Sequence, residues 1–98
     1  MKIGVLGTGA VGQTLGTKFV AMGHDVMMGA RAADNEKVLD FARRTGGRAG
    51  TFADAAAHGE LVFNCTRGDT AVATLTACRA ALAGKVLADV SNPLDFSK

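Results

Sequence analysis

The glycine-rich stretch near the N-terminus constrains the fold of this chain most. An apolar run over residues 3–6 leads directly into Gly7-Thr8-Gly9-Ala10-Val11-Gly12, which has the spacing G-x-G-x-x-G. This spacing is typical of the turn between the first strand and first helix of a dinucleotide-binding βαβ unit. The first glycine permits the tight turn, the second lets a pyrophosphate approach the backbone, and the third lets the helix pack close to the strand. We therefore predict that the cofactor-binding residues here are Gly7, Thr8, Gly9, Ala10, Val11 and Gly12, with the pyrophosphate at the helix N-terminus.

The residues after the motif support this interpretation. Apolar residues spaced for one face of a helix follow it, namely Val11, Leu15, Phe19 and Met22. Gly23 is expected to end that helix, and a second strand is predicted over Asp25–Met28. The alternative is a βαβ unit whose glycines serve packing only.

The end of the second predicted strand indicates which dinucleotide would bind. NAD-binding domains usually carry an acidic residue there, whereas NADP-binding domains offer an arginine to the 2′-phosphate. Here the sequence is Gly29-Ala30-Arg31, with no acidic residue before Asp34. We predict NADP, with Arg31 binding the 2′-phosphate; the alternative is that Arg31 is a solvated loop charge.

The rest of the chain alternates helices and strands. We predict a helix over Asn35–Arg44 capped by Asp34, a strand over Arg48–Thr51, a helix over Ala53–His58, a strand over Glu60–Cys65, a helix from Asp69 or Thr70 to Leu82, and a strand over Lys85–Val90. This alternation is typical of an α/β protein. The predicted fold is a Rossmann-type doubly wound parallel sheet of five strands in the order 3-2-1-4-5, with helices on both faces. Residues 1–98 then form one NAD(P)-binding domain, which we interpret as the N-terminal part of a longer protein.

In such a sheet, ligands bind at the carboxyl ends of the strands, where the strand order reverses. Polar residues lie at the carboxyl ends of the fourth and fifth predicted strands, and we predict that they contact the nicotinamide half of the cofactor: Asn64, Thr66, Arg67, Ser91 and Asn92. Loop hydrogen bonding, with a turn at Asn92-Pro93, is the alternative.

Composition excludes several classes of function. The net charge is +2, Tyr and Trp are absent, and no basic run suggests nucleic-acid binding. The apolar N-terminal run is too short for a signal peptide or a membrane span, so a cytoplasmic protein is expected. Cys65 and Cys78 are expected to be core residues, and no metal site is predicted.

The catalytic residues stay unknown from the sequence. Without Tyr there is no Tyr-x-x-x-Lys pair, and neither His24 nor His58 follows a predicted strand. Carbonyl reduction normally needs a proton donor, so this chain alone is not expected to be a complete carbonyl reductase. Hydride transfer between two ring cofactors needs no such donor.

The glycine turn through Arg31, Asn64-Cys65-Thr66, and residues 89–96 together resemble the deazaflavin-coenzyme-dependent NADP oxidoreductase family. Its NADP-binding domain also resembles that of membrane ferric reductases. The resemblance covers essentially the whole chain and implies NADP(H) at the glycine turn, with Thr8 and Arg31 near the 2′-phosphate. Ala30 stands where the family commonly has Ser or Thr, a loss for which Lys37 could compensate. Family members continue beyond the fifth strand and form dimers, so an open edge that permits a homodimer is expected.

The predicted function is hydride transfer between NADP(H) and a deazaflavin, a flavin or another small acceptor. The alternative is a non-catalytic dinucleotide-binding module or redox sensor. A third interpretation is an acid dehydrogenase or an enzyme similar to ketopantoate reductase, whose catalytic lysine would have to lie outside this chain.

Overall fold

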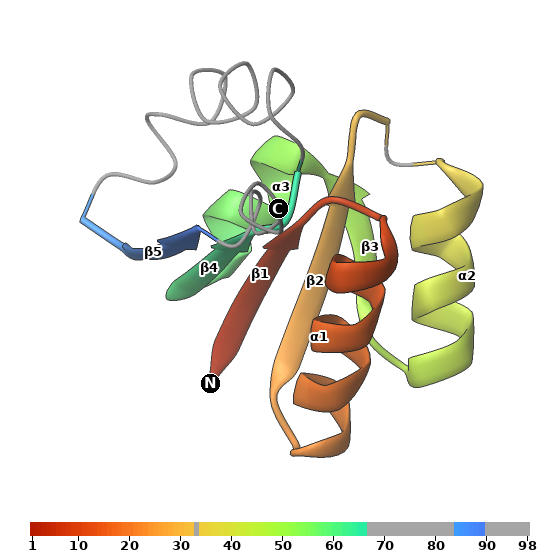
Figure 1. Cartoon of the computed structure of the whole chain (residues 1–98), viewed down its shortest axis with the longest axis horizontal. Coiled ribbons are helices and arrows are strands. Elements are labelled where there is room, and N and C mark those ends of the chain that lie inside the picture. The colour runs from red at the N-terminus through yellow and green to blue at the C-terminus, as the bar shows by residue number, and fades with distance from the viewer. Residues whose placement is uncertain (33, 67–83, 90–98) are drawn as a thin grey trace, which may run out of the picture.

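The structure, a computed structural model, describes residues 1–32, 34–66 and 84–89. Its elements are β1 (Lys2–Leu6), α1 (Ala10–Ala21), β2 (Asp25–Ala30), α2 (Glu36–Thr45), β3 (Arg48–Thr51), α3 (Phe52–His58), β4 (Leu61–Asn64) and β5 (Val86–Asp89) (Figure 1). The five strands form one parallel sheet in the order β3-β2-β1-β4-β5, which confirms the predicted fold.

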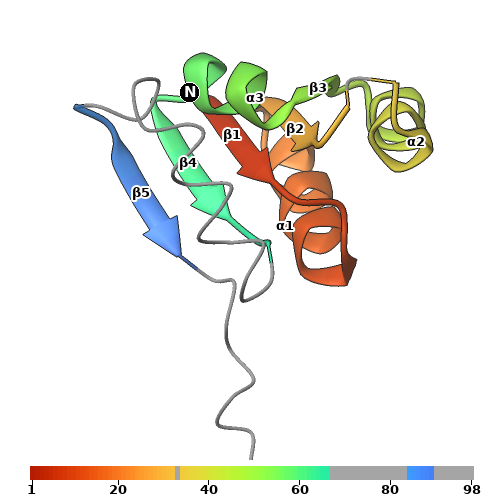
Figure 2. The ribbon, with the colours of Figure 1, turned by 90° about the horizontal axis from the view of Figure 1, so that it is seen from above.

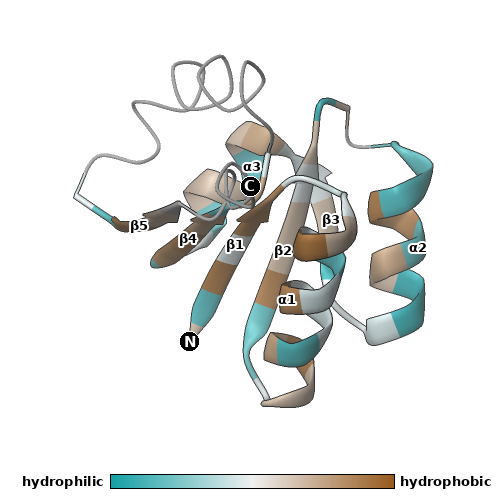
Figure 3. Cartoon of the chain, in the orientation of Figure 1, coloured by the Kyte–Doolittle hydropathy of each residue, from teal (hydrophilic) through white to brown (hydrophobic). Residues whose placement is uncertain are grey.

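The sheet has helices on both faces. Seen from above, α1 lies on one side of the strands and α3 on the other (Figure 2). Alternate side chains of β1 enter the two cores, because successive residues of a strand point to opposite faces. One core holds Ile3, Val5, Val26, Met28, Ala30, Val38, Phe41 and Cys65, and the other holds Leu6, Ala55, Ala56 and Val62. Hydrophobic residues accordingly occupy much of the strands, while hydrophilic residues cover much of α2 (Figure 3).

Helix α1 packs through two glycines and through half of the predicted apolar stripe, since Leu15 and Phe19 are partly buried against the core. Its buried residues are Gly12 and Gly16, whereas Val11 and Met22 are exposed, so the prediction was wrong for those two side chains. The reason is the close approach of the neighbouring elements. A Cβ built on Gly16 would lie 2.8 Å from Cε1 of the fully buried Phe41.

The N-cap of α2 differs from the prediction by one residue. Asn35, not Asp34, caps the N-terminus, and its Oδ1 accepts a hydrogen bond from the Lys37 amide at 2.8 Å. Gly46 ends the helix in the left-handed conformation, with φ +83°. Helix α3 begins with a capping box between Thr51 and Asp54.

Most element bounds match the predictions to within one residue. Strand β2 is the exception, because it continues past Met28 to Ala30 and so ends immediately before Arg31. Cys65 is buried, as predicted. The predicted helix up to Leu82, with Cys78, lies outside the described residues, as does Val90. Within the described part of the chain, no helix is long and apolar enough to cross a membrane.

Substitution of Gly16 by Ala tests the close packing of α1. Alanine gains about 1 kcal/mol of helix propensity, but overpacking a buried contact costs about 1–3 kcal/mol. Because the new Cβ would meet the Phe41 ring, we expect a net loss of about 1 kcal/mol in the free energy of unfolding, measured by urea denaturation. Thr14→Ala, at an exposed position of the same helix, is the control and should be neutral or stabilising. A gain in stability for Gly16→Ala would contradict the packing described.

A second prediction concerns Asp25, at the amino end of β2. The Arg48 guanidinium donates to its carboxylate at 2.8 Å and lowers the pKa of Asp25; burial opposes this shift, and nearby His58 and Lys2 assist it. Because the pKa is lower in the folded chain, the pair stabilises the fold above the unfolded pKa. That contribution is lost as the pH falls through the folded pKa, below about pH 4.

The urea midpoints of the native chain and of Asp25→Asn should therefore differ at neutral pH and converge in acid. Asp34→Asn removes an exposed carboxylate that has no ion pair among the described residues, and should change neither midpoint. If the difference in urea midpoint between the native chain and Asp25→Asn stayed constant down to the lowest pH, the prediction would be contradicted.

Candidate functional site

The carboxyl ends of β1, β2 and β4 meet at one edge of the sheet. Leu6 pairs in register with Gly29 on one side and with Asn64 on the other. Backbone bonds continue this alignment past the strand ends, from the Gly7 amide to the Gly29 carbonyl at 3.0 Å and from the Cys65 amide to the Leu6 carbonyl at 2.8 Å. The glycine turn is thus held against both neighbouring strands.

Two glycines of the turn are required by the protein itself. Gly7 has φ +120°, and a Cβ there would lie 2.9 Å from the Cys65 carbonyl oxygen. A Cβ on Gly12 would lie 2.7 Å from the Gly7 carbonyl oxygen. Any side chain at Gly12 would therefore push α1 away from the end of β1.

Gly9 has a different environment. It is exposed, has φ −75°, and a Cβ built on it would meet no atom within 4 Å. Nothing in the described chain requires glycine at this position. A bare backbone facing open space is what the approach of a ligand would require.

The N-terminus of α1 lacks the caps seen on the other described helices. No side chain accepts from its first-turn amides and no acidic residue lies in that turn, whereas Asn35 caps α2 and Thr51 caps α3. The first amides of a helix have no carbonyl partner within the helix. Together with the positive end of the helix dipole, they favour an anion.

Arg31 borders a cavity beside this turn. The cavity has a volume of about 290 Å³, and its lining residues are Thr8, Ala30, Arg31, Asn35 and Phe52. Arg31 is exposed and makes no hydrogen bond or ion pair with the described residues. Lys37 lines a neighbouring cavity, together with Gln13 and Arg43 among others. Thr8 and Arg31, predicted to lie together, therefore share one cavity.

Asn64 and Thr66 form a buried pair at the end of β4. Asn64 is fully buried, and its Oδ1 accepts from the Thr66 amide at 3.2 Å and from the Thr66 hydroxyl at 2.6 Å. Its Nδ2 is buried and has no hydrogen-bond partner among the residues that the structure describes. The Thr66 hydroxyl is thus committed to Asn64 in this structure. Arg67, Ser91 and Asn92 lie outside the described residues.

The two histidines do not lie at the carboxyl edge of the sheet. His58 Nε2 contacts the backbone oxygen of Asp25, at the start of β2, at 3.0 Å. The ring of His24 lies edge-on to that of Phe19, with 6.2 Å between centroids. No group of three or more metal-ligating side chains occurs among the described residues.

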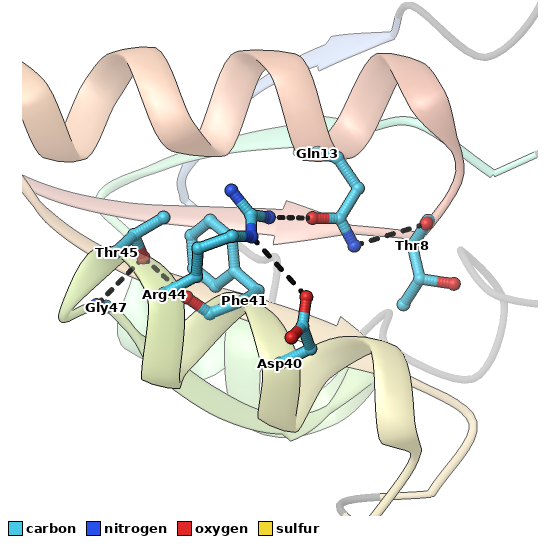
Figure 4. A network of polar contacts seen from close by, with 7 residues as sticks. All are labelled: Thr8, Gln13, Asp40, Phe41, Arg44, Thr45 and Gly47. Carbon is cyan, nitrogen blue, oxygen red and sulfur yellow. Dashed lines mark hydrogen bonds and ion pairs between the residues drawn. The ribbon is translucent and has the colours of Figure 1, made fainter.

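A chain of polar contacts that sequence reasoning missed leads from α2 to the glycine turn (Figure 4). Arg44 donates to Gln13 Oε1 at 2.7 Å, and Gln13 Nε2 donates to the Thr8 carbonyl at 3.4 Å. Gln13 directly follows the G-x-G-x-x-G motif, but its partner is 31 residues away. No helical or strand periodicity could have revealed that pair.

Known proteins resemble this chain in sequence and fold. An F420-dependent NADP reductase of Methanothermobacter marburgensis is 35% identical over 103 residues, spanning 97% of this chain and 46% of its own length. The crystal structure of a candidate F420-dependent NADP-reductase from Arthrobacter sp. FB24 has 42% identity and a TM-score of 0.82, covering 99% of this chain and 48% of that chain. An imine reductase of Streptomyces aurantiacus is more distant, with 26% identity and a TM-score of 0.76 over 93% of this chain and 32% of its own.

This chain spans about half the length of the two reductases with F420 in their names. Residues 2–93 match the family described as NADP oxidoreductase, coenzyme F420-dependent. A match over nearly the whole chain, with the glycine turn and strand order already described, identifies the family. The chain belongs to the coenzyme F420-dependent NADP oxidoreductases.

Proposed function

We propose that this chain is the NADP(H)-binding part of an oxidoreductase that transfers hydride between NADP(H) and a deazaflavin of the F420 type. The observation that carries the proposal is one continuous feature of the carboxyl edge. An exposed glycine and an uncapped helix N-terminus adjoin a cavity bordered by an arginine without a described partner. The names of two relatives point to the same pair of cofactors.

The proposed binding roles follow the geometry. The first-turn amides of α1, around Ala10 and Val11, bind the diphosphate. Arg31 and Thr8 bind the 2′-phosphate in the 290 Å³ cavity. Thr66, Arg67, Ser91 and Asn92 remain proposed contacts to the nicotinamide half.

When bound, NADPH supplies a hydride, and the residues of the chain hold the cofactor in position for its transfer. Neither histidine lies at the proposed site, so the described residues hold no evident proton donor for a carbonyl. Transfer between two rings depends mainly on alignment of donor and acceptor carbons. This favours a deazaflavin or flavin acceptor. Because imine reductases share the fold, the experiment below also includes an imine.

Oxidation of NADPH by the protein should be followed with an F420-type deazaflavin, a flavin and a cyclic imine in parallel. We expect turnover with the deazaflavin and slower or no turnover with the imine. Tight NADP binding without turnover on any acceptor would favour the alternative, a dinucleotide-binding redox sensor. A homodimer and a cytoplasmic location also remain predictions.

Arg31→Asp tests the choice of dinucleotide. One charge-assisted hydrogen bond contributes about 1.5–3 kcal/mol, so NADP affinity should fall about ten- to a hundredfold while NAD affinity is retained or improved. Calorimetric titrations with both dinucleotides measure the ratio. Arg43→Asp, at an exposed residue outside the Arg31 cavity, is the matched charge control. An unchanged ratio for Arg31→Asp would reject the assignment.

Gly9→Val separates binding from folding. Because a Cβ at Gly9 meets no protein atom, the cost to stability should stay near 1 kcal/mol or less, the size of a changed N-cap. If the diphosphate approaches the backbone there, affinity for both NADP and NAD should fall at least about tenfold, or about 1.4 kcal/mol. Thermal denaturation and calorimetry measure the two effects. Full affinity in a folded variant would place the ligand elsewhere.

A further inference from the structure

We propose that Gln13 and Arg44 are positioning residues that hold the glycine turn in its dinucleotide-binding conformation, with Arg44 acting through Gln13. This inference rests on the proposed NADP(H) binding and extends it to two side chains outside the G-x-G-x-x-G motif. It is carried by the polar chain that joins Arg44, Gln13 and the Thr8 carbonyl (Figure 4).

Arg44 determines the orientation of the Gln13 amide. A guanidinium has donors only, so the atom of Gln13 that faces Arg44 at 2.7 Å must be the oxygen. The amide nitrogen is then left to face the Thr8 carbonyl at 3.4 Å. Because that second contact is long, the direction of the amide depends on the short bond to Arg44.

Arg44 is itself held by its neighbours. Its Nε lies 3.4 Å from Asp40 Oδ2, one turn earlier on α2. Beside it, the Phe41 ring lies against the bare face of Gly16, which fixes the spacing of α1 and α2. The guanidinium is therefore presented to Gln13 from a packed helix rather than from a loop.

Holding the Thr8 carbonyl has a consequence for the next amide. The Thr8–Gly9 peptide is trans, since the described chain contains no cis peptide bonds, and a planar trans peptide directs its C=O and N–H to opposite sides. With the Thr8 oxygen turned toward Gln13, the Gly9 N–H is directed to the other side of the turn. In Figure 4 the Thr8 hydroxyl points away from Gln13, unlike the Thr8 carbonyl.

The Gln13–Thr8 bond is the second tether of the turn. The first is the backbone bond from the Gly7 amide to the Gly29 carbonyl at 3.0 Å. A Cβ built on Gly9 would meet no atom within 4 Å, and the Gly9 carbonyl accepts a hydrogen bond from the Gln13 amide at 2.9 Å. The Thr8–Gly9 peptide is therefore held by hydrogen bonds at Gly7, at the Thr8 carbonyl and at the Gly9 carbonyl. Preorganisation of this kind lowers the cost of ordering the turn when a ligand binds.

Gln13→Met tests the proposal, because it keeps the length of the side chain and removes both hydrogen bonds. The loss of about one net hydrogen bond predicts a three- to tenfold weaker affinity, on the order of 1 kcal/mol. The loss should be equal for NADP and NAD, since both carry the diphosphate, so their ratio stays unchanged. Affinity for 2′-AMP, which has no diphosphate, should fall less than affinity for either dinucleotide. Calorimetry or NMR titration well below the melting temperature makes each measurement on folded protein.

Arg44 variants test whether it acts through Gln13. Arg44→Met should weaken both dinucleotides as Gln13→Met does, Arg44→Lys should restore much of the affinity, and the double variant should bind no worse than Gln13→Met alone. Arg43→Met removes a neighbouring exposed cation of the same helix that donates no hydrogen bond to Gln13, and should leave affinity unchanged at moderate salt.

The outcomes separate the two proposals. If the native chain binds neither NADP nor NAD, the proposed function fails. If the native chain binds and Gln13→Met binds equally well, or if the losses for Gln13 and Arg44 add, the positioning role is overturned. A loss confined to NADP in Gln13→Met, with NAD affinity unchanged, would also overturn it, because both dinucleotides carry the diphosphate.

Discussion

The contact between Gly12 and the Gly7 carbonyl determines how close α1 lies to the end of β1, and the rest of the site depends on it. A Cβ at Gly12 would come within 2.7 Å of that oxygen, and one at Gly16 within 2.8 Å of the Phe41 ring. Helix α1 therefore comes closest to its neighbours at these two glycines, with Leu15 and Phe19 packed against the core beside them, and its N-terminus lies directly beyond the first strand. Close packing at Gly12 and open space at Gly9 are complementary, since one positions the backbone and the other leaves it accessible.

The charges around the turn are unequal in a way that favours an anionic ligand. Arg44 pairs with Asp40, whereas Arg31 has no carboxylate partner in the described part of the chain. The helix beside it begins without an acidic residue or a capping side chain. Two sources of positive potential thus lie next to one cavity, and a dinucleotide with a 2′-phosphate carries anionic groups suited to both.

Motif spacing predicted the turn, the strand order and the position of Arg31, because each follows from backbone geometry that glycine and chain alternation impose. The apolar stripe of α1 was predicted correctly at Leu15 and Phe19, which pack against the core, and incorrectly at Val11 and Met22, which are exposed. The motif predicted close packing at Gly12, whereas apolar periodicity alone does not show that glycines make the closest contacts of this helix. Asp34 and Asn35 are both good capping residues in sequence, and only the path of the chain decides between them. The Gln13–Arg44 bond joins two helices, and its geometry depends on their packing rather than on local sequence.

A crystal structure of the protein with NADP tests the central claim most directly. The account predicts the diphosphate against the first-turn amides of α1 beside Gly9, and the 2′-phosphate in the cavity bordered by Thr8 and Arg31. A dinucleotide bound elsewhere, or a saturating soak that leaves the end of α1 without a diphosphate, would contradict it.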